Sequence, residues 1–303
     1  MRYKRLWRDG IINGEVMLVN PHCLGYKYIV DLGISTSVEN EKQVMEFLTN
    51  KPYIRHIVGA FAKYNFWTKV ALHDVKKLAG ILGDLESNPN IKGVDALIWA
   101  EAVNVEYPEN LMIKSCANNG KERPVEKRPV NLEETELDEK DRKIASILSR
   151  KSRTPFRKIA AELGISTKSV IQRYKRLRGN VLSLSTITVD LNKLGYNSYA
   201  MMFLKAANRS KIPEICAHLL QIPNMIVLIK LIGVYDLYAC VALTDFQELF
   251  KLTEQIRRIP GIQKTETSLT PIFPSWPLHL FPSLIESALM EPKSWIGSPS
   301  NKQ

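Results

Sequence analysis

Hydrophobic and polar positions follow a helical period in one part of the chain and an extended pattern in another. Between residues 139 and 177, apolar positions recur every three or four residues, as on the buried face of a helix. From residue 184 onward, runs rich in β-branched and aromatic residues predict strands, with amphipathic runs between them. The predicted strands are 184–191, 196–205, 226–232, 237–243 and 262–273, and the predicted helices are 212–220 and 246–259. From residue 196 the order is strand, helix, two strands, helix, strand, which is the ferredoxin-like split βαβ arrangement.

The helical part predicts three short helices with clear start and stop signals. Ile144 and Leu148 lie on one face of the first helix. Pro155 suits the start of the second, because its missing N–H would be unpaired there anyway. Gly164 ends the second helix, and Ser166 is a good N-cap for the third. Two helices joined by a glycine-containing turn, behind a supporting helix, are typical of a helix-turn-helix; a three-helix bundle that does not bind DNA is the alternative.

The chain contains one module twice. The pentapeptide RYKRL at residues 2–6 recurs at residues 173–177, 171 positions later. Further matches follow in the same order at nearly the same offset: LGY at 24–26 and 194–196, VALHD at 70–74 and VALTD at 241–245, and NPNI at 88–91 and IPGI at 259–262. Matches of this kind indicate a duplicated structural unit. The first copy begins inside the helix that corresponds to the third helix of the second copy.

These patterns predict an α+β protein with two ferredoxin-like (βαββαβ) domains and a tri-helical, winged-type helix-turn-helix between them. The predicted segments are a remnant of a recognition helix (1–12), a first α/β domain (13–103), a linker (104–135), the helix-turn-helix (136–180), a second α/β domain (181–275) and a C-terminal tail (276–303). Two explanations of the short first copy stay open. Either a full helix-turn-helix is encoded upstream of a mis-assigned start codon, or the loss is real and the two α/β domains pair within one chain.

The distribution of charge points to a nucleic-acid partner. The net charge is +11 with a pI of about 9.4. Residues 137–178 hold 13 Lys and Arg residues against 4 Asp and Glu residues, a net charge of +9. A basic excess confined to one small segment is the electrostatic footprint expected of a nucleic-acid reader. A solvated basic face, or a site for acidic proteins, is the alternative.

The outward face of the third helix supplies the candidate DNA contacts. The first turns of a recognition helix enter the major groove, so polar residues there are expected to contact base edges. This group comprises Thr167, Lys168, Ser169 and Gln172, with Ser166 at the start of the helix. Basic residues farther along, and on the second helix, are expected to hold phosphates. This second group comprises Arg157, Lys158, Arg173, Lys175 and Arg176.

The combined motifs resemble those of the Lrp/AsnC family of transcription regulators, which join a helix-turn-helix to an effector-sensing α/β domain called RAM. They are LDxxDRKI at 137–144, AELGIS at 161–166, LGY at 194–196, GxxD at 233–236 and PGIxxTET at 260–267. The resemblance covers residues 136 to about 275 fully, and 2 to about 103 as a shortened second copy. It implies dimers or larger assemblies through the RAM sheets, with small effectors, often amino acids, between dimers.

The resemblance also implies an effector site in the second copy. The loop that holds Gly233, Tyr235 and Asp236 is where the family places its effector contacts. A carboxylate suits the ammonium group of an amino acid, and glycine lets a ligand approach the backbone. The first copy has Ala62 and Asn65 at the matching positions, so the second copy is the expected sensor. An ordinary β-turn is the alternative for these turn-forming residues.

Several other classes of protein are disfavoured. No hydrolase elbow, P-loop or zinc-protease motif is present. The four cysteines have no CxxC spacing and the five histidines have no ligand spacing, so neither a metal nor another cofactor is expected. The N-terminus has no apolar signal-peptide core, and the most apolar stretch, 225–243, contains charged residues that suit strands better than a membrane span.

One enzymatic alternative remains. Siroheme decarboxylases resemble this fold and work as paired copies; their motif places a histidine before a Tyr-Asn-x-Trp run. Here His56 and residues 64–67 echo that motif, but Ala60 and Ala62 stand where an arginine and a second histidine are expected. Cationic groups suited to tetrapyrrole carboxylates are therefore missing. A third possibility is an oligomerisation partner that does not bind DNA.

The sequence thus predicts a non-enzymatic, cytoplasmic regulator of prokaryotic, and more narrowly archaeal, kind. It would bind double-stranded DNA through the helix-turn-helix and oligomerise through the α/β domains. It would respond, if at all, to a small effector such as an amino acid.

Overall fold

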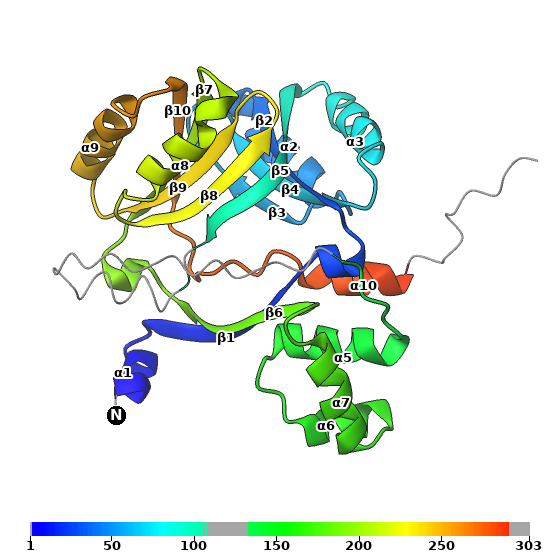
Figure 1. Ribbon diagram of the computed structural model, residues 1–303. Coiled ribbons are helices and arrows are strands. Elements are labelled where there is room, and N and C mark those ends of the chain that lie inside the picture. The colour runs from blue at the N-terminus through cyan, green and yellow to red at the C-terminus, as the bar shows by residue number, and fades with distance from the viewer. Residues whose placement is uncertain (1, 106, 108–132, 291–303) are drawn as a thin grey trace, which may run out of the picture. The chain divides into compact units, whose positions relative to one another are not determined.

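The computed structural model describes residues 2–105, 107 and 133–290, with side chains to residue 286 (Figure 1). The chain divides into two compact units. Unit 1 comprises Met1–Gly14, Tyr26–Pro129 and Thr186–Leu278, and unit 2 comprises Glu15–Gly25, Val130–Ser185 and His279–Gln303. Within the described part of the chain, no helix is both long and apolar enough to cross a membrane. Most of the predicted linker, including Cys116, lies outside the described residues.

The second copy of the repeat has the predicted elements in the predicted order. They are β7 (Ser198–Ala206), α8 (Ile212–Leu219), β8 (Met225–Ile232), β9 (Leu237–Leu243), α9 (Phe246–Arg257) and β10 (Ile262–Pro271). The strand order β10-β7-β9-β8 is that of a ferredoxin-like sheet. Asp245 starts α9, because its carboxylate accepts from the backbone N–H groups of Gln247 and Glu248. The helices bury their apolar faces on one side of this sheet, where Leu219 and Ile256 are fully buried.

The first copy repeats this topology. Its elements are β2 (Tyr28–Thr36), α2 (Glu41–Thr49), β3 (His56–Gly59), β4 (Phe66–Leu72), α3 (Lys77–Glu86) and β5 (Ile91–Val105). The strand order is β5-β2-β4-β3. The predicted fold class is therefore confirmed. β5 runs to Val105, so the connection to the second copy begins later than predicted, and the other domain boundaries stay predictions.

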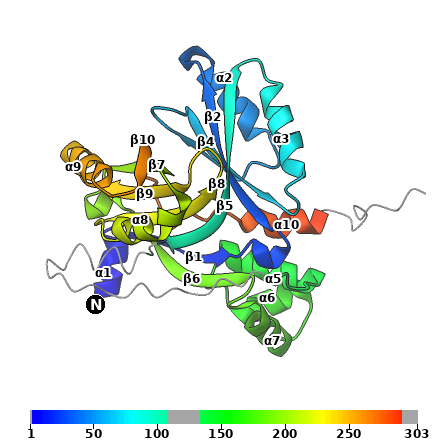
Figure 2. The same ribbon diagram turned by 45° about the horizontal axis from the view of Figure 1, so that its top comes forward.

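The two copies form one eight-stranded sheet (Figure 2). β5 of the first copy pairs antiparallel with β8 of the second, with Trp99 opposite Leu231. At the other end of the sheet, β3 and β10 are linked by the isolated bridge between Phe61 and Leu269. The sheet therefore curls until its two outer strands meet at a single point.

The inner faces of the two half-sheets pack against each other in an aromatic core. The ring of Trp67 lies 4.7 Å from that of Phe203 and 5.9 Å from that of Tyr238. Tyr64 contacts Phe203 edge-on at 5.8 Å. These side chains come from both copies and are almost entirely buried. The α/β sheets thus pair within one chain, as in the second explanation of the short first copy, and these faces cover each other.

Gly233 is required for the close contact between the copies. A Cβ atom at this position would lie 2.7 Å from the carbonyl oxygen of Ala96 and 2.6 Å from Cδ2 of Leu97. Both contacts belong to β5 of the first copy, and a backbone oxygen cannot move aside as a flexible side chain can. Only glycine fits here without displacing β5.

Unit 2 contains the predicted three helices. They are α5 (Glu139–Arg150), α6 (Phe156–Leu163) and α7 (Thr167–Leu177). A capping box between Asp138 and Asp141 starts α5. Gly164 ends α6 with φ of 62°, a left-handed conformation that glycine adopts without strain.

The C-terminal tail adds a fourth helix to this unit. α10 (Pro282–Met290) packs on α5, and Leu284 and Ile285 are fully buried. The hydroxyl of Ser146 donates to Glu286 at 2.9 Å, and Arg150 forms an ion pair with the same carboxylate. The predicted short helix at 284–290 is confirmed and begins two residues earlier. Trp276 belongs instead to the aromatic core of unit 1.

The repeat extends to the start of the described chain. α1 (Arg2–Arg8) precedes β1 (Ile12–Val19) as α7 precedes β6 (Leu182–Val189), and β1 and β6 pair in a two-stranded sheet. The RYKRL pentapeptide is helical in both copies.

We expect Gly233→Ala to lower the free energy of unfolding by about 1–3 kcal/mol, because the added methyl group would press into β5. Denaturant unfolding of the full chain measures this change. Gly93→Ala is the matched control, since a Cβ at Gly93 of β5 meets nothing within 4 Å. Equal effects of the two substitutions would contradict the steric account.

Candidate nucleic-acid interface

α7 presents its polar face to solvent. Ser166 caps its N-terminus by accepting a hydrogen bond from the backbone N–H of Ser169 at 3.1 Å. Val170 and Leu177 are fully buried on the opposite face, against the other two helices. The helix is therefore fixed by a cap at its start and by an apolar stripe along its length.

Most of the predicted DNA contacts lie on this open face. The exposed residues are Ser166, Thr167, Lys168, Gln172, Lys175 and Arg176 on α7 and its cap, and Arg157 and Lys158 on α6; Ser169 is half-buried. α6 and α7 thus bring together polar groups for base edges and cations for phosphates.

Two arginines of α7 have internal partners. Arg173 donates to the carboxylates of Asp138 at 2.6 Å and of Asp141 at 2.8 Å. Arg176 also forms an ion pair with Asp141, whose side chain is 0% exposed. The hydrogen bonds to Asp138 and Asp141 stabilise the charged guanidinium and so raise the pKa of Arg173. Arg173 therefore holds α7 against the start of α5, and its expected phosphate role stays a prediction.

The same contacts act on the capping carboxylate. Burial by itself would raise the pKa of Asp138, but hydrogen bonds from Arg173 and from the backbone N–H of Asp141 outweigh burial and lower it.

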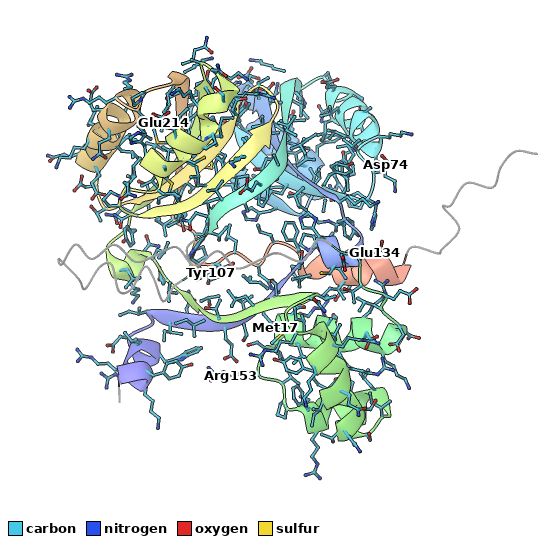
Figure 3. All side chains as sticks on the ribbon, in the orientation of Figure 1. Met17, Asp74, Tyr107, Glu134, Arg153 and Glu214 are labelled. Carbon is cyan, nitrogen blue, oxygen red and sulfur yellow. The ribbon has the colours of Figure 1, made fainter. Side chains whose placement is uncertain are left out.

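Arg153, labelled in Figure 3 on the loop before α6, forms an ion pair with Glu15 of β1. Part of the positive charge of this segment is thus neutralised inside the unit.

The expected effector residue Asp236 is also engaged internally. It is 1% exposed and accepts hydrogen bonds from the backbone N–H of Ala206 at 3.0 Å, from Lys205 at 3.2 Å and from Arg209 at 3.0 Å. These three donors show that Asp236 fixes the end of β7. Its role as an effector contact stays a prediction.

Tyr235 belongs to a polar network that joins the two copies. Its hydroxyl accepts from Nζ of Lys63 at 3.0 Å and donates to Glu266. Lys63 also pairs with Asp95 at 2.8 Å, and Tyr64 donates to that carboxylate at 2.7 Å. Burial and the bond to Glu266 raise the pKa of Tyr235 to about 12. Two residues of the expected effector loop, Gly233 and Tyr235, therefore contact the first copy. Their role as effector contacts stays a prediction.

The sequence contained an unused signal for this network. Tyr64 and Asp95 in the first copy are separated from Tyr235 and Glu266 in the second by the same offset of 171 that relates the rest of the repeat. Each copy therefore has the same tyrosine–carboxylate pair. Lys63 matches Val234, so a single lysine serves both pairs.

The residues that echo the siroheme decarboxylase motif lie in and beside the inner core. Nε2 of His56 is buried without a hydrogen-bond partner, and burial, assisted by nearby Lys69, lowers the pKa of this imidazole to about 4. Asn65 donates to Glu41 at 2.7 Å and accepts from the backbone N–H of Thr36 at 2.8 Å. Trp67 is 1% exposed. Among the residues that the structure describes, no three His, Cys, Asp or Glu side chains gather as metal ligands would.

Solved structures share this architecture. The crystal structure of the siroheme decarboxylase NirDL aligns with 95% of this chain and 86% of its own, with a TM-score of 0.64 and 16% sequence identity. The same enzyme in complex with an iron-uroporphyrin III analogue aligns equally well. At this level of identity, the likeness shows a common fold.

Two family models and several curated proteins match the second part of the chain. Residues 137–178 match the AsnC-type helix-turn-helix domain, and residues 198–270 match the Lrp/AsnC ligand binding domain. The HTH-type transcriptional regulator FL11 of Pyrococcus horikoshii is 28% identical over 134 residues, which are 44% of this chain and 88% of that protein. LysM of Saccharolobus solfataricus is 28% identical over 134 residues, which are 44% of this chain and 92% of that regulator. In its second part, the chain is therefore similar to the Lrp/AsnC transcriptional regulators in two stretches, residues 137–178 for the helix-turn-helix and residues 198–270 for the ligand-binding domain.

Proposed function

We propose that this protein is a sequence-specific, double-stranded-DNA-binding transcription regulator that acts in the cytoplasm. The observation that carries the proposal is the exposed, basic polar face of α7 within a helix-turn-helix of AsnC type. A capped helix held on one side by an apolar core, with polar and cationic groups on the other, is suited to enter a major groove. Because phosphate neutralisation supplies much of the affinity, binding is expected to weaken steeply as salt rises.

The side chains of this face divide into two roles. Thr167, Lys168, Ser169 and Gln172 lie in the first turns of α7 and are assigned to base edges. Arg157, Lys158 and Lys175 are exposed cations assigned to phosphates. Arg173 positions the helix through Asp138 and Asp141, and Arg176 is shared between Asp141 and the exposed face, with its side chain 53% exposed.

Self-association would occur on a surface other than the inner sheet faces, which are already buried. A helix-turn-helix contacts only a few base pairs, so a palindromic site would require two chains. Small molecules, amino acids among them, remain candidate effectors. Gly233 and Tyr235 contact the first copy, which favours an effector site outside the loop that holds them.

Siroheme decarboxylation is the second candidate, because the full-length fold likeness extends over both copies. The residues of this chain fit it poorly: Ala60 and Ala62 supply no cation for tetrapyrrole carboxylates, and the hydroxyl of Tyr64 is held by Asp95. We therefore expect incubation with siroheme, followed by mass analysis, to show no loss of CO₂. A loss that depends on the intact protein would replace the regulator proposal with the enzymatic one.

Gln172→Ala should weaken binding to the preferred operator by about 1–3 kcal/mol while leaving affinity for unrelated DNA almost unchanged. Lys175→Ala is the matched variant: it should weaken binding to every sequence alike and reduce the salt slope by about 1. Fluorescence anisotropy with a selected operator and a scrambled duplex, at two salt concentrations, measures both effects. If both variants lose affinity equally on every sequence, the assignment of roles is wrong.

Arg173→Ala should lower the free energy of unfolding by about 1–3 kcal/mol, because the buried carboxylate of Asp141 loses a charged donor. Lys168→Ala, on the exposed face of the same helix, is the control and should leave stability within about 0.5 kcal/mol. Denaturant unfolding followed by circular dichroism distinguishes them. Unchanged stability together with a loss of DNA affinity would return Arg173 to the phosphate contacts.

A further inference from the structure

The two copies meet along two seams that the repeat makes equivalent. One seam joins β5 to β8, and the other lies between β10 and β3, which occupy the matching positions after the offset of 171. The first is an antiparallel ladder from Ile98 to Val105 of β5, with two register shifts along its length. The second is held by the single bridge between Phe61 and Leu269. We call them the sealed seam and the open seam.

Large side chains close the sealed seam. Trp99 and Leu231 stand opposite each other in its ladder, and Gly233 lets the following loop touch β5. In the open seam the matching residues are Thr270, Ala60 and Ala62. Thr270 stands where the sealed seam has Trp99, and Ala60 stands where it has Leu231, so the side chains of the open seam are smaller.

The backbone reinforces this difference. Pro271 on β10 has no N–H to donate to a neighbouring strand, which limits pairing at this edge. β3 has four residues, whereas its equivalent β8 has eight. The reduced side-chain volume and the short ladder leave a space between the strands.

That space is a pocket of about 340 Å³, at the lower end of the volumes of small-molecule sites. Its apolar lining includes Ile57, Val58, Phe61, Phe66, Ile272 and Phe273. The walls are therefore mainly aliphatic and aromatic.

The side chains that line the pocket carry negative charge and no positive charge. Glu41 supplies the sole ionisable side chain among the lining residues, which include no lysine, arginine or histidine. Oε1 of Glu41 accepts from Nδ2 of Asn65 at 2.7 Å, which orients the carboxylate. Asn65 is itself held by the backbone N–H of Thr36 at 2.8 Å. An oriented carboxylate beside an apolar wall is complementary to a cation that carries a hydrocarbon group.

We propose that the open seam binds a small primary amine with an apolar body, its ammonium group on Glu41 and its hydrocarbon part against Phe61 and Phe66. A zwitterionic amino acid fits less well, because its carboxylate would meet no cation among the lining residues. A tetrapyrrole is excluded by both its size and its carboxylates. Binding at this pocket is independent of the DNA-binding role; control of DNA binding by the amine would rest on the proposed function.

The test is a calorimetric titration of the full chain with 3-methylbutylamine and with 2-phenylethylamine. Their neutral analogues 3-methylbutanol and 2-phenylethanol, and the amino acids leucine and phenylalanine, are titrated alongside. We expect saturable binding of at least one amine with one site per chain, and about tenfold or greater weakening for the alcohol and the amino acid of the same shape. Equal affinity for amine and alcohol, or no saturation by either amine, overturns the proposal.

Two variants locate the site. Ala60→Leu combined with Thr270→Trp gives the open seam the residues of the sealed one and should abolish binding. Glu41→Gln keeps an acceptor for Asn65 but removes the charge, and should weaken amine binding about tenfold or more without changing alcohol binding. Glu46→Gln, at an exposed position of the same helix, is the control and should bind as the parent does. If amine binding survives the double substitution, the ligand lies elsewhere and the proposal fails.

The parallel measurement of DNA affinity keeps the two proposals separate. Saturable amine binding by a chain that does not bind DNA supports the pocket and contradicts the regulator. DNA binding without saturable amine binding has the opposite meaning. Thermal unfolding of each variant verifies that it is folded.

Discussion

The burial of two aromatic sheet faces against each other within a single chain is the constraint on which unit 1 depends. β4 and β9 are buried at every position, since helices cover one side and the partner half-sheet covers the other. Trp67, Phe203 and Tyr238 would form a large exposed apolar patch if the two copies separated. Neither copy has a complete core alone, so the pairing is part of the fold itself.

The inner core also contains a charged pair. Asp31 and Lys69 face each other on β2 and β4, 2.7 Å apart, and Trp99 donates to the same carboxylate at 2.9 Å. Burial raises the pKa of Asp31, against the opposing effect of Lys69 and of these hydrogen bonds. Such a buried ion pair contributes little net stability, but a shift that separated the two charges would leave each buried without a partner and would destabilise the fold. It therefore favours one register of the half-sheets over others.

Local patterns in the sequence were sufficient to predict the fold class and most elements. Gly164, Ser166 and Asp245 act within a few residues of their own positions, and β9 has the predicted bounds. The repeat then extended the same topology to the first copy. The offset of 171 also matches Tyr64 with Tyr235 and Asp95 with Glu266, which no local pattern connects.

What the sequence did not predict depends on partners distant along the chain. Arg173 was expected to face DNA, but its acceptor Asp141 lies 32 positions earlier. Gly233 and Tyr235 were assigned to a ligand, because nothing nearby reveals that Leu97 and Lys63 occupy their surroundings. The open seam required both copies in place, since Ala60 and Thr270 line one pocket only after the sheet has curled. Contacts between residues far apart in the sequence, within the helix-turn-helix for Arg173 and between the copies for Gly233 and Tyr235, account for these differences.

The covalent fusion of the copies has a consequence for how such a molecule can evolve. In an assembly of two identical polypeptides, every substitution in the contact appears twice, so both edges must stay alike. Here each edge is encoded separately, and the two copies hold different residues at matching positions, Trp99 in one and Thr270 in the other. Encoded in tandem, the pair also does not come apart on dilution, because the partner's local concentration is set by the connecting chain. One edge is thus free to specialise while the other maintains the fold.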